Sequence, residues 1–231
     1  MIRFYLLLLV ITLLPMSLSA QDDVEYKMEI GGGLGGSFYI GDLNSTFYKN
    51  TGFAGGLLAR YLLNPRMAFK TKLSYNSIKG NTTDVTQFYP DDPNSGNNSP
   101  EPLRYSFSSN VIDFSVMYEY NFLPYGRGNS YLGYSRLAPF VQLGIGLSYG
   151  QEASAITVNL PIGFGAKYKL SSRLNLALDW TMHFTLSDKL DGLEAPHGIK
   201  GSGFKNKDNY SETLITLTYD IFPKCINCNK D

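Results

Sequence analysis

The sequence predicts an all-β protein, an eight-stranded antiparallel transmembrane β-barrel of the outer-membrane type. Three observations predict this fold: an export signal at the N-terminus, eight segments with apolar residues at every second position, and segment lengths above those of ordinary strands. The composition agrees, because the 231 residues include 17 Tyr, 14 Phe and 23 Gly. A barrel with an apolar outer face and a polar lumen has these features.

Residues 1–20 have the order of a secretory signal peptide. Arg3 provides a positive charge, residues 4–14 are apolar apart from one Thr, and small residues follow up to Ala20. The apolar stretch is shorter than the about 20 residues that a membrane-spanning helix needs. We therefore expect an exported chain that is cleaved after Ala20.

Two consecutive segments show the clearest alternation. Apolar side chains occupy every second position from Ile156 to Leu170 and again from Leu174 to Leu186. Successive side chains of a strand point to opposite faces, so each segment has one apolar and one polar face. On a helix the same residues would spread around the whole circumference. Both segments are therefore predicted to be strands.

Six further segments alternate in the same way, and they are expected to complete a barrel domain over residues 21–222. Four of the eight exceed the about 9–11 residues that a tilted transmembrane strand needs, and three more have 10 or 11 residues. Soluble strands usually have about 5–6 residues, so strand length favours a membrane barrel over a secreted sandwich or a lipocalin-like barrel. In chain order, the six segments are Met28–Ile40, Phe53–Leu63, Met67–Asn76, Ile112–Phe122, Leu137–Tyr149 and Ile215–Phe222.

The connections between the segments predict the orientation. Residues 63–66 and 170–173 form tight turns, and the Pro- and Gly-containing connection 123–136 lies at the same end. The polar stretch 81–102 connects strands at the other end. Short turns of bacterial barrels face the periplasm, so we expect a protein of the cell outer membrane with both termini in the periplasm.

No catalytic centre is predicted. Asp179 and His183 lie on the polar face of one strand, but they are four residues, or about 13 Å, apart along it, too far for a direct hydrogen bond. We interpret them as lumen groups that pair with Lys167, Lys169 or Glu119 on nearby strands.

The sequence also predicts no cofactor, no metal site and no nucleic-acid partner. The chain has only two His, which leaves no cluster for zinc or iron. Its 20 basic and 20 acidic residues balance, which argues against a nucleic-acid surface. The glycine-rich run Gly31–Gly36 lacks the strand–helix context of a phosphate loop, so we interpret it as a site of strand curvature and close backbone approach.

Both cysteines, Cys225 and Cys228, lie in the tail formed by residues 223–231. The tail offers neither the βαβ context of a thioredoxin-type redox pair nor the further ligands of a zinc site. Thiols in an oxidising periplasm are expected to form disulfides. Two alternatives stay open: a local bridge between the two cysteines, or attachment to a periplasmic partner.

Six short stretches carry a family resemblance: Gly36–Asn44, Phe69–Leu73, Asn110–Phe114, Glu119–Tyr125, Pro161–Leu170 and Lys205–Asp208. In this order they resemble the PorG family, small barrel proteins of the Bacteroidetes type IX secretion system. With the Cys225/Cys228 tail the series covers essentially the whole mature chain. Asp179 departs mildly from the family pattern, because family members commonly have Glu before the Trp of the predicted strand Leu174–Leu186.

The resemblance implies a non-enzymatic outer-membrane component that anchors or docks a periplasmic ring. The implied partners are a PorK-like lipoprotein, PorN-like ring proteins and outer-membrane lipid. The periplasmic end is then expected to carry the partner surface, reinforced by Cys225 or Cys228. The alternative is a surface-exposed OmpX-like adhesin or ligand-binding barrel that acts through outer loops such as residues 84–100. An enzyme would instead need an Asp/His or Ser/His cluster at one rim.

Overall fold

The computed structural model describes residues 26–41, 44, 46–81, 106–126, 134–151, 154–186 and 208–223. No helix in these ranges is long and apolar enough to cross a bilayer. The eight strands of 12 to 16 residues confirm the predicted fold class. They are β1 (Tyr26–Ile40), β2 (Gly52–Asn64), β3 (Met67–Asn81), β4 (Ser106–Asn121), β5 (Leu137–Gly150), β6 (Ala155–Lys169), β7 (Leu174–Thr185) and β8 (Asn209–Pro223).

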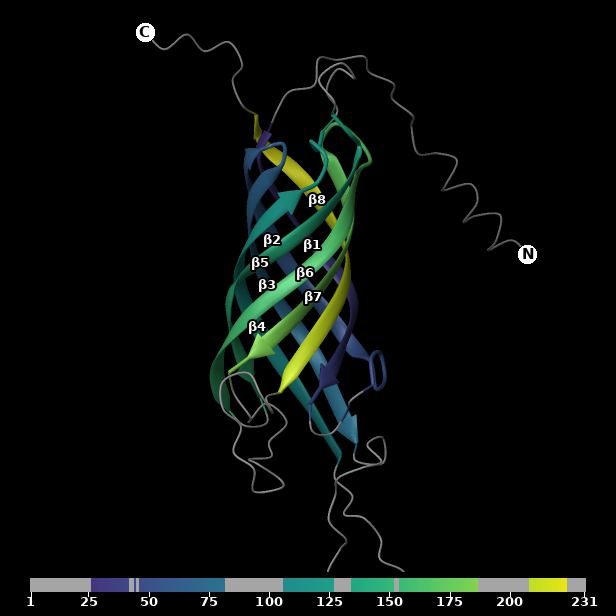
Figure 1. Cartoon of the computed structure of the whole chain (residues 1–231), viewed down its shortest axis with the longest axis vertical. Coiled ribbons are helices and arrows are strands. Elements are labelled where there is room, and N and C mark those ends of the chain that lie inside the picture. The colour runs from purple at the N-terminus through teal and green to yellow at the C-terminus, as the bar shows by residue number, and fades with distance from the viewer. Residues whose placement is uncertain are drawn as a thin grey trace, which may run out of the picture.

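The strands form a closed antiparallel barrel (Figure 1). Each strand pairs with the next in the chain, and β1 also pairs with β8. The β1–β8 ladder runs from the pair Tyr26 and Pro223 to the pair Ile40 and Asn209, so β8 extends one residue beyond the expected barrel limit at Phe222. Closure leaves no sheet edge with unpaired backbone groups, which is a condition for spanning a bilayer.

The two ends of the barrel differ. We name the end where β1, β3, β5 and β7 begin the turn end, and the opposite end the loop end. The described chain begins and ends at the turn end, which lies uppermost in Figure 1. The predicted tight turns are confirmed there: the Asn64 side chain accepts a hydrogen bond from Arg66 N at 2.8 Å, and Leu170 N donates to Leu174 O at 2.9 Å.

The barrel wall has the two faces that the alternation predicts. Large apolar side chains point outward and are exposed, with Leu57 at 68 % and Ile156 at 73 %. Charged side chains such as Arg60, Lys70 and Glu119 point inward and are fully buried. This arrangement inverts that of a soluble protein, and it suits a wall surrounded by hydrocarbon.

Three strands extend further at the loop end than the alternation predicts. β3 reaches Asn81 rather than Asn76, β4 begins at Ser106 rather than Ile112, and β8 begins at Asn209 rather than Ile215. In these extensions the polarity of the wall is reversed: the buried inward positions include Ile78, Val111 and Tyr210, whereas the outward positions are mainly Ser, Asn, Thr and Lys. An outward polar face indicates that these extensions project beyond the hydrocarbon, and the reversal hid them from the sequence pattern.

The closing seam requires glycine at Gly31. A Cβ added there would lie 2.0 Å from the carbonyl oxygen of Leu217 on β8, so Gly31→Ala should push the paired strands apart and lower the free energy of unfolding by about 1–3 kcal/mol. Gly55→Ala is the control, because its added Cβ would meet only side-chain atoms of Leu34 and Phe53 at 3.1 Å or more. Urea unfolding in phospholipid vesicles measures both variants. Equal unfolding midpoints for the two would contradict the role of the seam.

Candidate functional site: a sealed ionic interior

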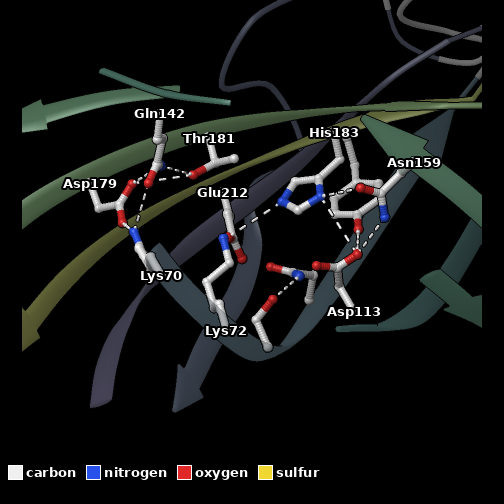
Figure 2. Close-up of polar contacts among 12 residues, drawn as sticks. Lys70, Lys72, Asp113, Gln142, Asn159, Asp179, Thr181, His183 and Glu212 are labelled. Atoms are coloured by element: carbon white, nitrogen blue, oxygen red, sulfur yellow. Dashed lines mark hydrogen bonds and ion pairs between the residues drawn. The ribbon is translucent and has the colours of Figure 1, made fainter. Parts of the chain in front are cut away.

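Asp179 lies in the middle of the lumen as the counter-ion of a lysine. Its carboxylate forms an ion pair with Lys70, which reaches across from β3, and it accepts a hydrogen bond from Gln142 Nε2 at 2.7 Å (Figure 2). Asp179 is 2 % exposed and Lys70 is fully buried. Both charges are therefore paired with each other inside the lumen.

His183 lies in a second polar cluster nearer the loop end (Figure 2). Its Nδ1 is 3.6 Å from Asp113 Oδ2, its Nε2 is 3.5 Å from Glu212 Oε1, and its ring stacks on Tyr210 with centroids 4.5 Å apart. Asp113 Oδ2 also accepts hydrogen bonds from the hydroxyls of Ser148 and Tyr210, each at 3.0 Å. These residue types occur in catalytic centres, but His183 and Asp113 are both 0 % exposed, which leaves no access for a substrate.

The partners that the sequence predicted for Asp179 and His183 are wrong. Lys167 instead donates to Glu119 at 2.7 Å, and Lys169 pairs with Asp220, both nearer the turn end. The partner of Asp179 is Lys70, which belongs to β3 rather than to a strand beside β7. A lysine side chain is long enough to cross a narrow lumen, so the facing wall supplies the partner, and strand adjacency does not reveal it.

Arg60 is the main lumen residue that the sequence analysis missed. Its Nη1 donates to Glu29 Oε2 at 3.0 Å, and its Nε donates to Glu119 Oε2 at 2.9 Å. Lys167 shares Glu119, so β1, β2, β4 and β6 are joined through one ionic cluster. A signal was available: Arg60 stands between apolar neighbours at an inward position of β2, where the alternation requires a lumen residue.

Tyr125 closes the lumen at the turn end. It lies in the connection between β4 and β5, where its backbone N–H donates to Pro65 O and its hydroxyl donates to Asn175 Oδ1 at 2.7 Å. The ammonium groups of Lys167 and Lys169 lie 4.6 and 5.5 Å from the centre of its ring. Burial raises the pKa of the Tyr125 hydroxyl well above its ordinary value. The neutral ring therefore covers the ionic cluster.

An apolar cluster closes the lumen near the loop end. The ring of Tyr39 meets Phe107 edge to face at 4.9 Å, and its hydroxyl donates to Asp208 Oδ1 at 2.5 Å. Ile78 and Val111 are fully buried in the same cluster. Together with Tyr125, this cluster leaves a filled interior between two closed ends, as expected for a small barrel.

The described residues bring together no three His, Cys, Asp or Glu side chains that could hold a metal ion. The two predicted partner-binding residues, Cys225 and Cys228, lie outside the described part of the chain. The last described residue of the chain, Pro223, pairs with Tyr26 at the turn end. The chain therefore leaves the barrel at the turn end, two residues before Cys225.

Arg60→Met should be strongly destabilising, because it removes the cation that Glu29 and Glu119 share inside the barrel. Leaving a buried ion pair without one partner costs about 3–5 kcal/mol, and urea unfolding in vesicles measures the loss. The additional change Glu29→Gln should recover part of it. Lys79→Met is the control: Lys79 is an exposed cation near the loop end of β3, so its loss should cost less than about 1 kcal/mol. An Arg60→Met protein as stable as wild type would contradict the structural role of this cluster.

Solved barrels with similar folds come from several bacteria. Neisserial surface protein A (NspA) is 10 % identical, with a TM-score of 0.52 over 84 % of this chain and 97 % of that chain. Ail of Yersinia pestis is 12 % identical, with a TM-score of 0.45 over 85 % and 99 % of the two chains. OprG of Pseudomonas aeruginosa is 13 % identical, with a TM-score of 0.45 over 87 % and 98 %. At 10 % identity the likeness to NspA concerns the fold alone.

No curated protein matches the sequence. A family match, in contrast, covers nearly the whole chain, from residue 3 to residue 230. The chain therefore belongs to the family described as a domain of unknown function, DUF6089.

Proposed function

We propose that this protein is a non-enzymatic outer-membrane component of the type IX secretion machinery that anchors or docks a periplasmic ring complex. The sealed interior is the observation that carries the proposal. Arg60, Lys70 and Lys167 are paired with carboxylates inside the wall, and aromatic side chains close both ends. A barrel filled in this way offers surfaces to partners rather than a channel to a substrate.

The sequence resemblance to the PorG family supplies the class of partner, a PorK-like lipoprotein and PorN-like ring proteins. The geometry of the turn end is consistent with docking. Tyr26 and Pro223, the first and last described residues, meet there, and Tyr125 of the β4–β5 connection is hydrogen-bonded to Pro65 at the same end. Short turns of bacterial barrels face the periplasm, so the turn end is the proposed docking face.

A tagged full-length protein purified from its native outer membrane in mild detergent should bring the PorK-like and PorN-like proteins with it. A tagged eight-stranded barrel of another family is the control for non-specific recovery. Mass spectrometry of the recovered proteins measures the enrichment. Deletion of residues 84–100 should leave this enrichment and protein secretion unchanged, because the docking face lies at the opposite end.

The same deletion tests the alternative, a surface adhesin or ligand-binding barrel. If wild-type protein recovers no ring component, and the deletion abolishes binding to a surface ligand while sparing secretion, the ring-docking function is wrong and the alternative stands.

Cys225 and Cys228 are proposed to reinforce the docked ring. The double change Cys225→Ser and Cys228→Ser should reduce the recovery of ring proteins under non-reducing conditions, because a disulfide to the partner could no longer form. Wild-type protein treated with reductant before purification is the matched comparison. Unchanged ring recovery and unchanged secretion in the serine variant would show that the cysteines have no part in docking.

A further inference from the structure

The turn end carries one exposed cation at the start of every strand that begins there. Arg66, Arg136 and Arg173 directly precede the first residues of β3, β5 and β7, and Lys27 is the second residue of β1. All four side chains are exposed. We name these four residues the cationic collar.

No exposed carboxylate accompanies the collar in the part of the chain that the structure describes. Every described acidic side chain is buried in the barrel, namely Glu29, Asp113, Glu119, Asp179, Asp208, Glu212 and Asp220. Most of these carboxylates form ion pairs with lumen lysines or with Arg60, or accept hydrogen bonds from buried polar side chains. Among the described residues, no exposed carboxylate therefore neutralises the positive charge of the collar.

The collar lies at the level of an aromatic girdle. In β3, β5 and β7, the first residue pairs with an outward tyrosine of a neighbouring strand, Tyr120, Tyr168 and Tyr219 respectively. Tyrosine girdles of membrane barrels lie at the headgroup level of the bilayer. The three collar arginines, each one residue before these positions, are therefore at the height of lipid phosphates.

Two of the arginines are held toward the outer wall rather than over the lumen. Arg173 Nε donates to the hydroxyl of Tyr26 at 2.7 Å, its Nη1 donates to the hydroxyl of Tyr219 at 3.2 Å, and its guanidinium lies 5.2 Å from the centre of the Tyr26 ring. Arg66 Nη1 donates to the carbonyl of Phe122, an exposed residue at the end of β4. Both guanidinium groups are thus fixed beside lipid-facing side chains.

We propose that the cationic collar binds the phosphates of anionic phospholipid headgroups in the leaflet at the turn end. The guanidinium fork matches phosphate geometry, and a cation near an anionic membrane surface strengthens binding by about fivefold. An acidic protein would approach the turn end along the barrel axis, whereas Arg66 and Arg173 are tied to the outer wall. Position and chemistry therefore favour lipid over a protein partner.

Lipid selectivity of the folded full-length barrel tests the proposal. The protein is reconstituted into phosphatidylcholine vesicles that contain spin-labelled phosphatidylglycerol or spin-labelled phosphatidylcholine, and the immobilised lipid fraction is measured by electron paramagnetic resonance. Wild-type protein should prefer phosphatidylglycerol, and high salt should weaken this preference. Changing Lys27, Arg66, Arg136 and Arg173 to Gln should reduce the preference at least about threefold.

The control changes two exposed lysines of the loop end, Lys49→Gln and Lys79→Gln, and should keep most of the preference. It is compared with the double variant Arg136→Gln and Arg173→Gln, which loses the same number of charges and should show a reduced preference. If the quadruple variant does not fold, as judged by circular dichroism, the single variants Arg136→Gln and Arg173→Gln replace it, each with a smaller reduction expected.

Absence of a phosphatidylglycerol preference in wild type, or an unchanged preference in the folded collar variant, would overturn the proposal. If that variant keeps its lipid preference but loses proteins that co-purify with wild type, the collar serves an acidic protein partner instead. The vesicle assay contains no ring protein, so its result is independent of the proposed docking function.

Discussion

A chain that crosses hydrocarbon must provide every backbone N–H and C=O with a partner of its own, because lipid tails offer none. In this protein the pairing of β1 with β8 completes that requirement, along a ladder that runs almost the full length of both strands. At Gly31 the two backbones approach so closely that no side chain fits between them. Once the cylinder is closed, every second residue must face lipid and its neighbours must face a narrow interior.

The narrow interior explains why so many charges are buried together. Arg60, Lys70, Lys72, Lys167 and Lys169 each pair with a carboxylate, and several of these pairs join strands that are not neighbours in the sheet. Buried pairs of this kind contribute little net stability, but losing one partner leaves an unpaired charge at high cost. The pairs therefore favour one arrangement of the closed wall, and they occupy the space that a channel would need.

Because the interior is filled, the surfaces that can bind partners lie at the ends and on the outer wall of the barrel. At the turn end, the two ends of the described chain meet, Tyr125 covers the lumen, and the cations of the collar lie at the outer edge. The proposed protein contact and the proposed lipid contact use different parts of this end, because the ring would meet the turns along the barrel axis, and phospholipid would meet the guanidinium groups at the circumference. One small barrel could therefore hold a periplasmic assembly and remain fixed at a defined depth in the membrane.

The sequence by itself determined the number of strands, the faces of the alternating residues and the tight turns, because alternation and turn chemistry are local properties of the chain. It also placed Asp179 and His183 in the lumen. Only the tertiary structure decided that Asp179 pairs with Lys70, that Arg60 joins Glu29 to Glu119, and that β3, β4 and β8 continue past the point where their polarity reverses. The physical reason is that the partner of a side chain across the lumen depends on how the tilted strands face one another after closure. The alternation along one strand gives no information about the residues of the opposite wall.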